Sequence, residues 1–504
     1  MKTNFLQIVL SATVVLFATS CSDDLLNNSG VSGESQPTQE LTSAQLAEGS
    51  LENPDIPAAF IGGLYAQMVE FNSGGSGGQH TDFGHKSYDV FSDMLCGDMA
   101  LSVSTYGWYR ASITELQAPQ DFTLGENRMP WRYYYRIVRS ANTVIANLGG
   151  NDAIPETPEN IYAMGQAKAM RAHSYFYLTQ FFQKEYDASE EILPLYLEPG
   201  GSNEPKSTAG VIYDQMEKDL NEAITLLEGF QRAQKNEVNQ DVARMILAYV
   251  LGAKGGRDAE VAALTQQVIN SGAYTMLAAN EVTTTGFADV NTPSWMWGID
   301  LTENLGLGLV SWWGQVDAYS YSYAWAGDYK VIDQDLYDAI PADDVRKAQF
   351  NQDASSGRYL QPLQKFYASD AIGGVSQTVT ADYVYMRIEE AYLLNAEANA
   401  KAGNEPAART SLKALLDRRV SSSAYVDALS GQALLDEIYL QTRIELWGEG
   451  KSYLAMKRNK ATVTRGANHL SLVGEPIPYN DERFQFEIPQ DEIQNNPFVN
   501  NQNN

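Results

Sequence analysis

Apolar side chains recur at helical intervals over most of this chain, and this periodicity limits its fold more than any other feature. The clearest run carries Trp131, Tyr135, Val138, Ile145 and Leu148, at steps of three, four or seven residues. Residues at these steps lie on one face of an α-helix. Two glycines follow directly and provide a stop signal. The segment therefore predicts a long amphipathic helix.

The same pattern predicts further helices along the chain. Their expected ranges are 55–71, 159–183, 209–229, 240–253, 259–270, 383–402, 405–420 and 432–458. Gly403 and Asn404 form a turn between two of them, and Pro406 stands in the first turn of the next, where its missing N–H costs little. Short connections of this kind join helices into hairpins, so we predict a mainly α fold.

One of these hairpins has the spacing of a tetratricopeptide repeat. Ala396, Gly403, Ala408 and Leu412 are separated by seven, five and four residues, as the packing positions of such repeats are. Small side chains let the two helices approach closely, while Leu412 fills the groove between neighbours. The pattern favours a scaffold of tetratricopeptide-type helical hairpins.

The first twenty residues have the pattern of an export signal. Lys2 supplies a positive charge, and residues 5–18 form an apolar run too short for a permanent membrane span. Small residues at 18–20 precede Cys21 and resemble a bacterial lipobox, although that pattern usually has Leu in place of the first of them. We predict a signal peptide at 1–20 and a lipid on Cys21; the alternative is an ordinary secretory signal with a chance cysteine.

The residues after Cys21 predict an address and a tether. Ser22, Asp23 and Asp24 look like the acidic signal that sends lipoproteins of Bacteroidetes-type bacteria to the outer face of the outer membrane. The chain up to residue 45 is polar and has too little apolar surface to pack, which makes 21–45 a lipidated flexible tether. No linker-like segment divides the rest, so we predict a single domain at 46–504.

The charge of the chain excludes one class of partner. Its 63 acidic and 35 basic residues give a formal net charge of −28, which repels phosphate backbones and anionic lipid surfaces. Nucleic acid is therefore not expected as a partner, and a neutral or cationic ligand fits better. After the tether, no apolar stretch is long enough to span a membrane.

Six segments, in one order along the chain, resemble a known family. They lie at 131–142, 169–178, 212–223, 389–398, 443–450 and 488–497. The first begins Trp-Arg-Tyr-Tyr-Tyr-Arg-Ile, and the fifth reads Arg-Ile-Glu-Leu-Trp-Gly-Glu-Gly, followed by Lys451 where the family commonly has Arg. Together they resemble the SusD/RagB family of outer-membrane nutrient-binding lipoproteins.

This resemblance implies a function without chemistry on the ligand. A SusD-like protein has a helical scaffold with long loops and short β insertions, and it captures an oligomeric nutrient for a SusC-like TonB-dependent transporter. The protein would be held at the cell surface of the outer membrane by the lipid on Cys21. Most such ligands are glycans and a minority are peptides, so the resemblance alone leaves open whether an oligosaccharide or a peptide is bound.

Aromatic residues concentrate at 295–329, which holds five of the eight tryptophans. Four rings alternate with Ala and Ser, so an extended backbone would place them all on one face, where sugar rings or peptide side chains could stack. These four are Tyr319, Tyr321, Tyr323 and Trp325. The nearby polar residues Gln315, Asp317, Asp328 and Lys330 would hydrogen-bond to ligand hydroxyls.

Three more tryptophans complete the candidate ligand-binding residues. Trp312 and Trp313 belong to the same segment. Trp108 follows the Gly-rich loop 74–84 beside Tyr106, and the family assembles its ligand platform from a similar early loop and the middle insertion. The alternative is that the aromatic residues form the buried face of a strand on the scaffold, and Trp295 and Trp297 fit this alternative equally well.

Catalytic patterns are weak. The Gly-rich run at 74–78 lacks the Lys-Ser/Thr of a phosphate loop and is expected to be flexible, and the four histidines have no zinc-site spacing. Acidic pairs such as Glu389-Glu390 and Asp343-Asp344 could hydrolyse glycosidic bonds or hold calcium, but solvation and helix capping explain them more simply. We expect Cys96 to be a small buried residue, and we expect no catalytic residues and no cofactor apart from incidental calcium. A surface glycoside hydrolase is the less favoured alternative.

Overall fold

The computed structural model describes residues 45, 48–50, 53, 55–368 and 378–503, all within the unit formed by residues 43–504. The predicted signal peptide, Cys21, the acidic signal at 22–24 and the predicted tether except Gln45 lie outside the described residues. No helix among the residues described is long and apolar enough to cross a membrane.

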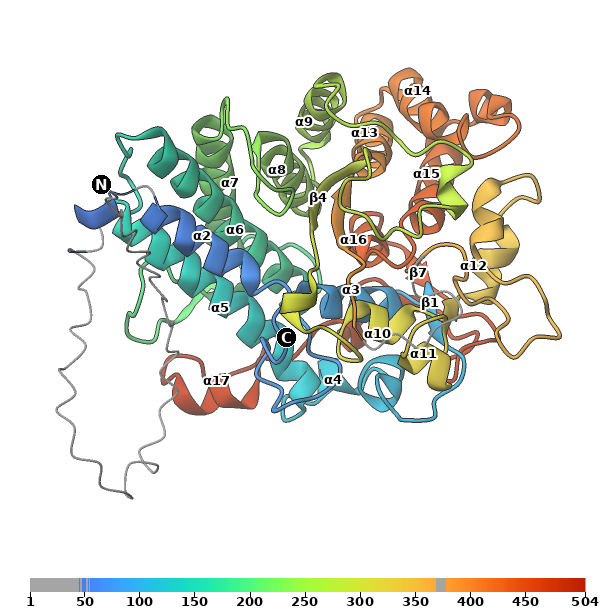
Figure 1. The fold of residues 1–504 in the computed structure, drawn as a ribbon, viewed down its shortest axis with the longest axis horizontal. Coiled ribbons are helices and arrows are strands. Elements are labelled where there is room, and N and C mark those ends of the chain that lie inside the picture. The colour runs from blue at the N-terminus through green and yellow to red at the C-terminus, as the bar shows by residue number, and fades with distance from the viewer. Residues whose placement is uncertain (1–44, 46–47, 51–52, 54, 369–377, 504) are drawn as a thin grey trace, which may run out of the picture. The chain divides into compact units, whose positions relative to one another are not determined.

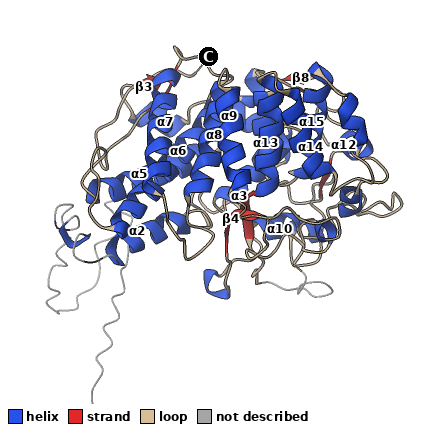
Figure 2. Ribbon diagram, turned by 90° about the horizontal axis from the view of Figure 1, so that it is seen from above, coloured by secondary structure: helices blue, strands red, loops and turns tan. Residues whose placement is uncertain are grey.

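The scaffold is a row of helices, and Figure 2 shows its members side by side. They are α2 (Asp55–Ala66), α5 (Gly125–Asn147), α6 (Pro158–Phe182), α7 (Ala209–Leu226), α8 (Gln240–Lys254), α9 (Asp258–Asn270), α13 (Ile388–Lys401), α14 (Glu405–Leu416) and α15 (Gly431–Glu445). From α5 to α9 each helix packs against the next, and α13 then packs against α9, α14 and α15. The predicted mainly α fold is confirmed.

Helix α6 packs between α5 and α7 and is buried along nearly its whole length. It begins where the Thr157 hydroxyl accepts a hydrogen bond from the Asn160 N–H, with Pro158 in the first turn. At Gly165 an added Cβ would lie 2.9 Å from Leu227 Cγ, so the missing side chain lets α7 approach closely. Arg171 donates two hydrogen bonds to Asp219 of α7, which pairs the buried charges of the two helices.

The short elements surround this row. The remaining helices are α3 (His85–Leu95), α4 (Gln117–Gln120), α10 (Trp312–Val316), α11 (Tyr323–Ala326), α12 (Gln334–Ala339), α16 (Lys451–Arg458) and α17 (Gln490–Asn495). The strands are β1 (Met99–Leu101), β2 (Glu191–Pro194), β3 (Lys206–Thr208), β4 (Trp295–Ile299), β5 (Lys330–Ile332), β6 (Tyr383–Arg387), β7 (Thr462–Val463) and β8 (Ile477–Pro478). They form four antiparallel pairs, β1–β5, β2–β3, β4–β6 and β7–β8. Figure 1 shows α10 and α11 beside β1 and α3, so the middle of the chain lies next to an early segment.

Two predicted helix boundaries are wrong. The first five residues of the range 383–402 form β6, whose pairing with the Trp-rich strand β4 overrides the helical pattern. The range 432–458 holds two helices, α15 and α16, because Gly448 and Gly450 between them have φ values of 81° and 72°. A Cβ on Gly450 would lie 2.7 Å from Cα of Asp89, so the turn also packs tightly on α3.

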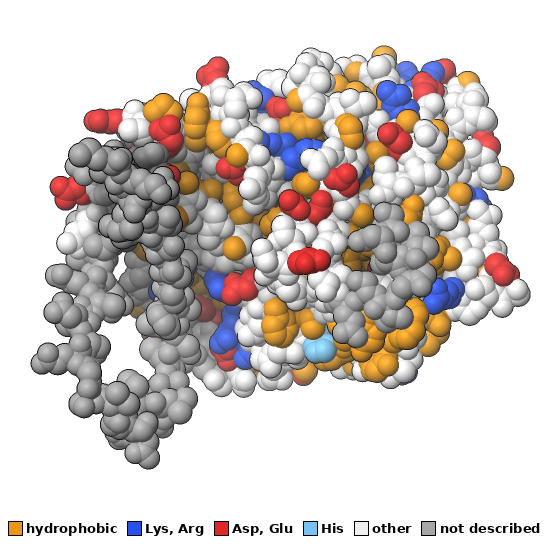
Figure 3. Space-filling view, in the orientation of Figure 1, with side chains coloured by type: hydrophobic (Ala, Val, Ile, Leu, Met, Phe, Trp, Pro, Cys, Tyr) orange, Lys and Arg blue, Asp and Glu red, His pale blue; other side chains and the backbone are white. Residues whose placement is uncertain are grey.

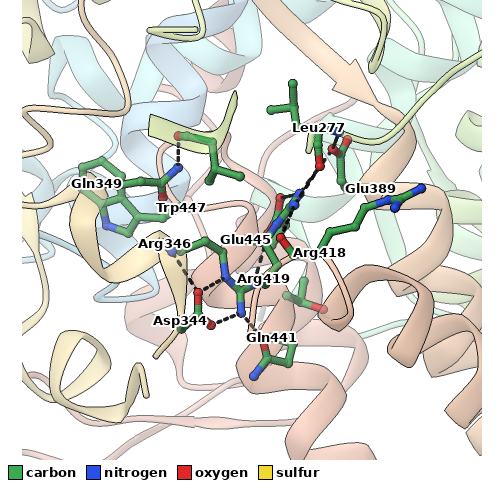
Figure 4. A network of polar contacts seen from close by, with 12 residues as sticks. Leu277, Asp344, Arg346, Gln349, Glu389, Arg418, Arg419, Gln441, Glu445 and Trp447 are labelled. Carbon is green, nitrogen blue, oxygen red and sulfur yellow. Dashed lines mark hydrogen bonds and ion pairs between the residues drawn. The ribbon is translucent and has the colours of Figure 1, made fainter. Parts of the chain in front are cut away.

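A buried network of charges holds the middle insertion, the chain between α9 and α13, on the scaffold (Figure 4). The carboxylate of Glu445, on α15, accepts hydrogen bonds from Arg346 at 3.0 Å, Arg387 at 2.8 Å and Arg419 at 2.9 Å. Arg346 also pairs with Asp344 at 2.6 Å. Removing charges from water is costly unless each is paired and hydrogen-bonded, as these are. The insertion is therefore fixed to the helices by polar contacts.

Candidate ligand-binding surface

Pairing of β1 with β5 brings two distant loops together. Ser102 donates its backbone N–H to the Tyr329 carbonyl at 3.2 Å, just beyond the ladder. The Asp328 carboxylate accepts the backbone N–H groups of Thr105 and Tyr106, and the Thr105 hydroxyl donates to the Gly327 carbonyl at 3.0 Å. The loop at 102–109 is thereby held against residues 319–329.

The Gly-rich loop is the third component and is closed by its own hydrogen bonds. The Asp82 carboxylate accepts the backbone N–H groups of Gly74 at 2.9 Å and Ser76 at 3.1 Å. The Asn72 side chain accepts those of Gly77 at 3.0 Å and Gly78 at 3.2 Å. The run expected to be flexible is thus held by internal bonds that place the residues following it.

His80 stands at the meeting point of the three loops. Its imidazole stacks on the indole of Trp108, with ring centroids 5.2 Å apart and planes 10° from parallel. Its Nδ1 lies 2.5 Å from the Tyr323 hydroxyl, and its carbonyl accepts a hydrogen bond from Gln315 Nε2 at 3.0 Å. Tyr323 also meets the Trp108 and Tyr106 rings edge to face.

Three rings on the loops joined here are exposed to solvent. Tyr106 is 57% exposed, Tyr321 39% and Trp325 43%, while Trp108 and His80 are half-buried. Figure 3 shows hydrophobic side chains gathered over α10 and α11 with a histidine at their edge. We call His80, Tyr106, Trp108, Tyr321 and Trp325 the aromatic surface. Ring faces of this kind can stack on the C–H faces of sugars.

Of the seven predicted ligand-binding residues, Trp108, Tyr321 and Trp325 lie on the aromatic surface. Tyr323 is 6% exposed and supports the rings from beneath. Tyr319 is half-buried and donates its hydroxyl to the Leu363 carbonyl at 3.2 Å, with its ring against Tyr367.

Trp312 and Trp313 do not reach the aromatic surface. Both are 1% exposed in α10, where Ser311 caps the helix by accepting the Gly314 N–H. The Trp312 ring packs on Phe366 and carries the Lys86 ammonium 4.2 Å from its centroid. These residues are core, so their assignment to the ligand surface is corrected. Trp295 and Trp297 are buried in β4.

The extended backbone expected at 319–325 is also wrong. Ser322 accepts the Trp325 N–H at 2.9 Å and starts the turn of α11. Tyr321 and Trp325 lie four residues apart across this turn and their rings come within 6.3 Å, while Tyr323 points inward. Ser322, which alternates with the rings in a strand pattern, here serves as a helix cap.

The polar residues expected to contact ligand hydroxyls are buried beneath the aromatic surface. Gln315, Asp317, Asp328 and Lys330 are all inaccessible. Lys330 Nζ donates to Gln315 Oε1 at 3.0 Å and lies over the Tyr109 and Tyr323 rings. Burial lowers the pKa of Lys330 to about 7. These side chains position the loops instead of binding the ligand.

His80 and Tyr106 are the functional candidates that sequence reasoning undervalued. The spacing of the histidines addresses only metal binding, although His80 lies within the Gly-rich loop 74–84 that precedes Trp108. Among the residues described, no group of three His, Cys, Asp or Glu side chains could hold a metal ion. Whether calcium is bound stays a prediction.

The acidic pairs considered for hydrolysis have structural contacts. Glu389 and Glu390 are buried, with Glu389 beside Arg387 at 3.2 Å and Glu390 accepting the Tyr249 hydroxyl at 2.8 Å. Asp344 belongs to the buried charge network, whereas Asp343 is exposed and accepts the Ser421 N–H at 3.1 Å. Cys96 is free and buried, as predicted.

Comparison with known proteins now decides the family. Residues 343–504 match the family model described as "SusD family", and residues 85–248 match the one described as "Starch-binding associating with outer membrane". The chain belongs to the SusD family. No curated protein matches this SusD-family chain in sequence.

Solved structures share its fold. A SusD-like carbohydrate binding protein from Bacteroides vulgatus is 22% identical with a TM-score of 0.73, and the match covers 89% of this chain and 97% of that one. A SusD superfamily protein from Bacteroides thetaiotaomicron is 22% identical with a TM-score of 0.74, covering 90% and 100%. At these identities the likeness shows the SusD-like fold alone.

Proposed function

We propose that this SusD-family protein captures an oligosaccharide on its aromatic surface and passes it to a SusC-like TonB-dependent transporter. The observation that carries the proposal is the stacked pair His80–Trp108, flanked by the exposed rings of Tyr106, Tyr321 and Trp325. Protein surfaces rarely leave several neighbouring aromatic rings in water without a partner for them.

The chemistry of the aromatic surface favours a neutral, hydroxyl-rich ligand. Its rings offer apolar faces for stacking, and the charged groups beneath them, Asp328 and Lys330, are buried and already bonded to the protein. The name of the structurally similar Bacteroides vulgatus protein, a carbohydrate binding protein, supports the same ligand class.

The placement that we propose follows the sequence signals. A lipid on Cys21 and the acidic signal behind it would hold the protein on the outer face of the outer membrane, beside its transporter. Protease treatment of whole cells tests this location: surface exposure that is lost when Asp23 and Asp24 are both changed to Ala supports it, and exposure unchanged by that double substitution contradicts it.

Binding without turnover is the third part of the proposal, because the acidic pairs considered for hydrolysis are engaged in structural contacts. Titration calorimetry of the purified protein against a panel of neutral oligosaccharides and peptides tests it, with release of new reducing ends measured in parallel. Saturable saccharide binding without new ends supports the proposal. Sustained release of ends would instead favour a surface glycoside hydrolase, and peptide binding alone would favour a peptide carrier.

A further inference from the structure

A second concave surface lies on the scaffold, between α5, the loop at 196–203 and α17. It encloses about 650 Å³, within the range of small-ligand sites, and shares no lining residue with the aromatic surface. Its two walls are tied together at one end, where Asn203 donates to the Asn495 carbonyl at 2.7 Å and Asn496 donates to the Glu204 carbonyl at 2.9 Å. We call it the arginine groove.

Four arginines from one face of α5 line the arginine groove. Arg128, Arg132, Arg136 and Arg139 follow one another at steps of four, four and three residues, the spacing that places side chains along one stripe of a helix. Glu198, Asp491 and Glu492 also line it, so its charges sum to about +1. With Glu70, which pairs with Arg136, the groove is about neutral, in a chain whose net charge is −28.

The existing ion pairs do not engage all four arginines equally. A single oxygen of Asp491 is shared by Arg128 at 3.3 Å and Arg132 at 2.6 Å. Arg136 pairs at 2.7 Å with Glu70, which is not among the lining residues. Within the described part of the chain, no carboxylate pairs with Arg139, whose side chain is exposed. Arg139 is thus available to an anionic ligand, and Arg136 can add the guanidinium N–H groups that its pair with Glu70 does not use.

Aromatic rings also line the arginine groove. Tyr135 and Tyr196 are half-buried at the groove and meet edge to face, with centroids 5.8 Å apart, and Trp131 packs on Tyr135. Guanidinium groups bind carboxylates with two parallel hydrogen bonds, and ring faces stack on sugar rings. The combination of both suits a sugar ring that carries a carboxylate.

We propose that the arginine groove is a second binding site, specific for a carboxylate-bearing saccharide such as a uronic acid oligomer. Arg136 and Arg139 bind the carboxylate, and Tyr135 and Tyr196 contact the ring. Asp491 competes for the same guanidinium stripe and limits affinity. This site goes beyond the proposed function, because it takes an anionic ligand at a place separate from the aromatic surface.

The test measures the binding of tetragalacturonic acid to the whole folded domain by calorimetry, at low and at high salt. The double variant R136A/R139A is expected to lose at least tenfold in affinity, and salt is expected to weaken wild-type binding. D491N is expected to bind several-fold more tightly, a gain that damage to the fold does not produce. The matched control R257A, at a half-buried arginine that pairs with Glu217 and Glu260 and does not line the arginine groove, is expected to bind like wild type.

Three outcomes overturn the arginine groove as a saccharide site. One is wild-type affinity for tetragalacturonic acid in R136A/R139A. Another is equal, arginine-dependent binding of a tetraglutamate peptide, which would make the groove a site for acidic peptides. The third is loss of tetragalacturonic acid binding in W108A but not in R136A/R139A, which would assign the ligand to the aromatic surface. Loss of neutral saccharide binding in W108A alone bears only on the proposed function, so the two failures are distinguishable.

Discussion

The imidazole of His80 lies parallel to the indole of Trp108, with ring centroids 5.2 Å apart. The two residues come from loops that are separate in sequence. Asp82 closes the first loop by internal hydrogen bonds, and Asp328, from the segment 319–329, holds the second. Stacking therefore fixes the face of Trp108 before a ligand arrives. A preorganised ring loses little freedom on binding, which raises affinity.

The first prediction concerns this ring. We expect Trp108→Ala to weaken oligosaccharide binding by about 1–3 kcal/mol, since a central aromatic contact commonly contributes that much. Trp325→Ala should act in the same direction. Calorimetry with the oligosaccharide selected from the panel measures both effects.

Phe498→Ala is the matched control, because Phe498 is exposed to the same degree as Tyr106 but is absent from the aromatic surface. Its affinity should equal that of wild type. Unchanged affinity in both tryptophan variants would remove the aromatic surface as the binding site.

The second prediction separates core tryptophans from surface ones. Trp312→Ala and Trp313→Ala should each lower the free energy of unfolding by about 3–5 kcal/mol, because they empty a large buried volume. Trp325→Ala, at a half-exposed position, should cost less than about 1 kcal/mol. Denaturant titrations of the three variants give these values. Equal losses in all three would contradict the division between core and surface.

The buried and the exposed tryptophans show which features of the fold can be predicted from the sequence. Helical periodicity predicted the scaffold well, because a stripe of apolar residues at helical steps has few other ways to be buried. Periodicity failed around Tyr319–Trp325, where Ser322 caps a short turn and an alternating pattern mimics a strand. The sequence shows that this region is rich in aromatic residues, but it does not show which of them are buried. Burial depends on distant partners, such as Phe366 against Trp312.

The site itself depends on long-range contacts that the sequence does not display. Trp108 was placed among the candidates by the position of its loop, but its stacking on His80 follows from β1 pairing with β5 and from the turn that Asp82 closes. Likewise, Gln315 and Lys330 are residue types that commonly hydrogen-bond to ligands, yet here they hydrogen-bond to each other under the rings. Polar residues near an aromatic segment are therefore weak evidence of direct ligand binding.

The third prediction concerns the buried charge network. Glu445→Ala should lower the free energy of unfolding by about 3–5 kcal/mol, because it leaves Arg346, Arg387 and Arg419 without their shared carboxylate in the interior. The control is Asp152→Ala, which removes a solvent-exposed pair with Lys218 and should lower the free energy of unfolding only slightly. Denaturant titration measures both variants. Similar small losses would mean that the network does not hold the insertion on the scaffold.

The last prediction concerns pH and two buried histidines. His85 and His173 have ring centroids 5.1 Å apart and are fully enclosed. Burial lowers the pKa of His173 to about 3 and holds that of His85 well below its ordinary value of about 6.5. Between pH 6.5 and 3 the unfolded chain therefore binds protons that the folded protein excludes.

It follows that these histidines contribute their full stability above pH 6.5 and lose it progressively as the pH falls toward about 3, at ~1.4 kcal/mol per pH unit for each residue. Denaturant titrations between pH 7 and 5 should show this slope, and His173→Asn, which keeps a polar side chain of smaller volume without the titrating ring, should show a shallower one. Because wild type and variant share every other titrating group, the difference between their slopes reports His173 itself. Parallel slopes would show that His173 takes up protons in the folded protein as readily as in the unfolded chain, and that its pKa is not lowered by burial.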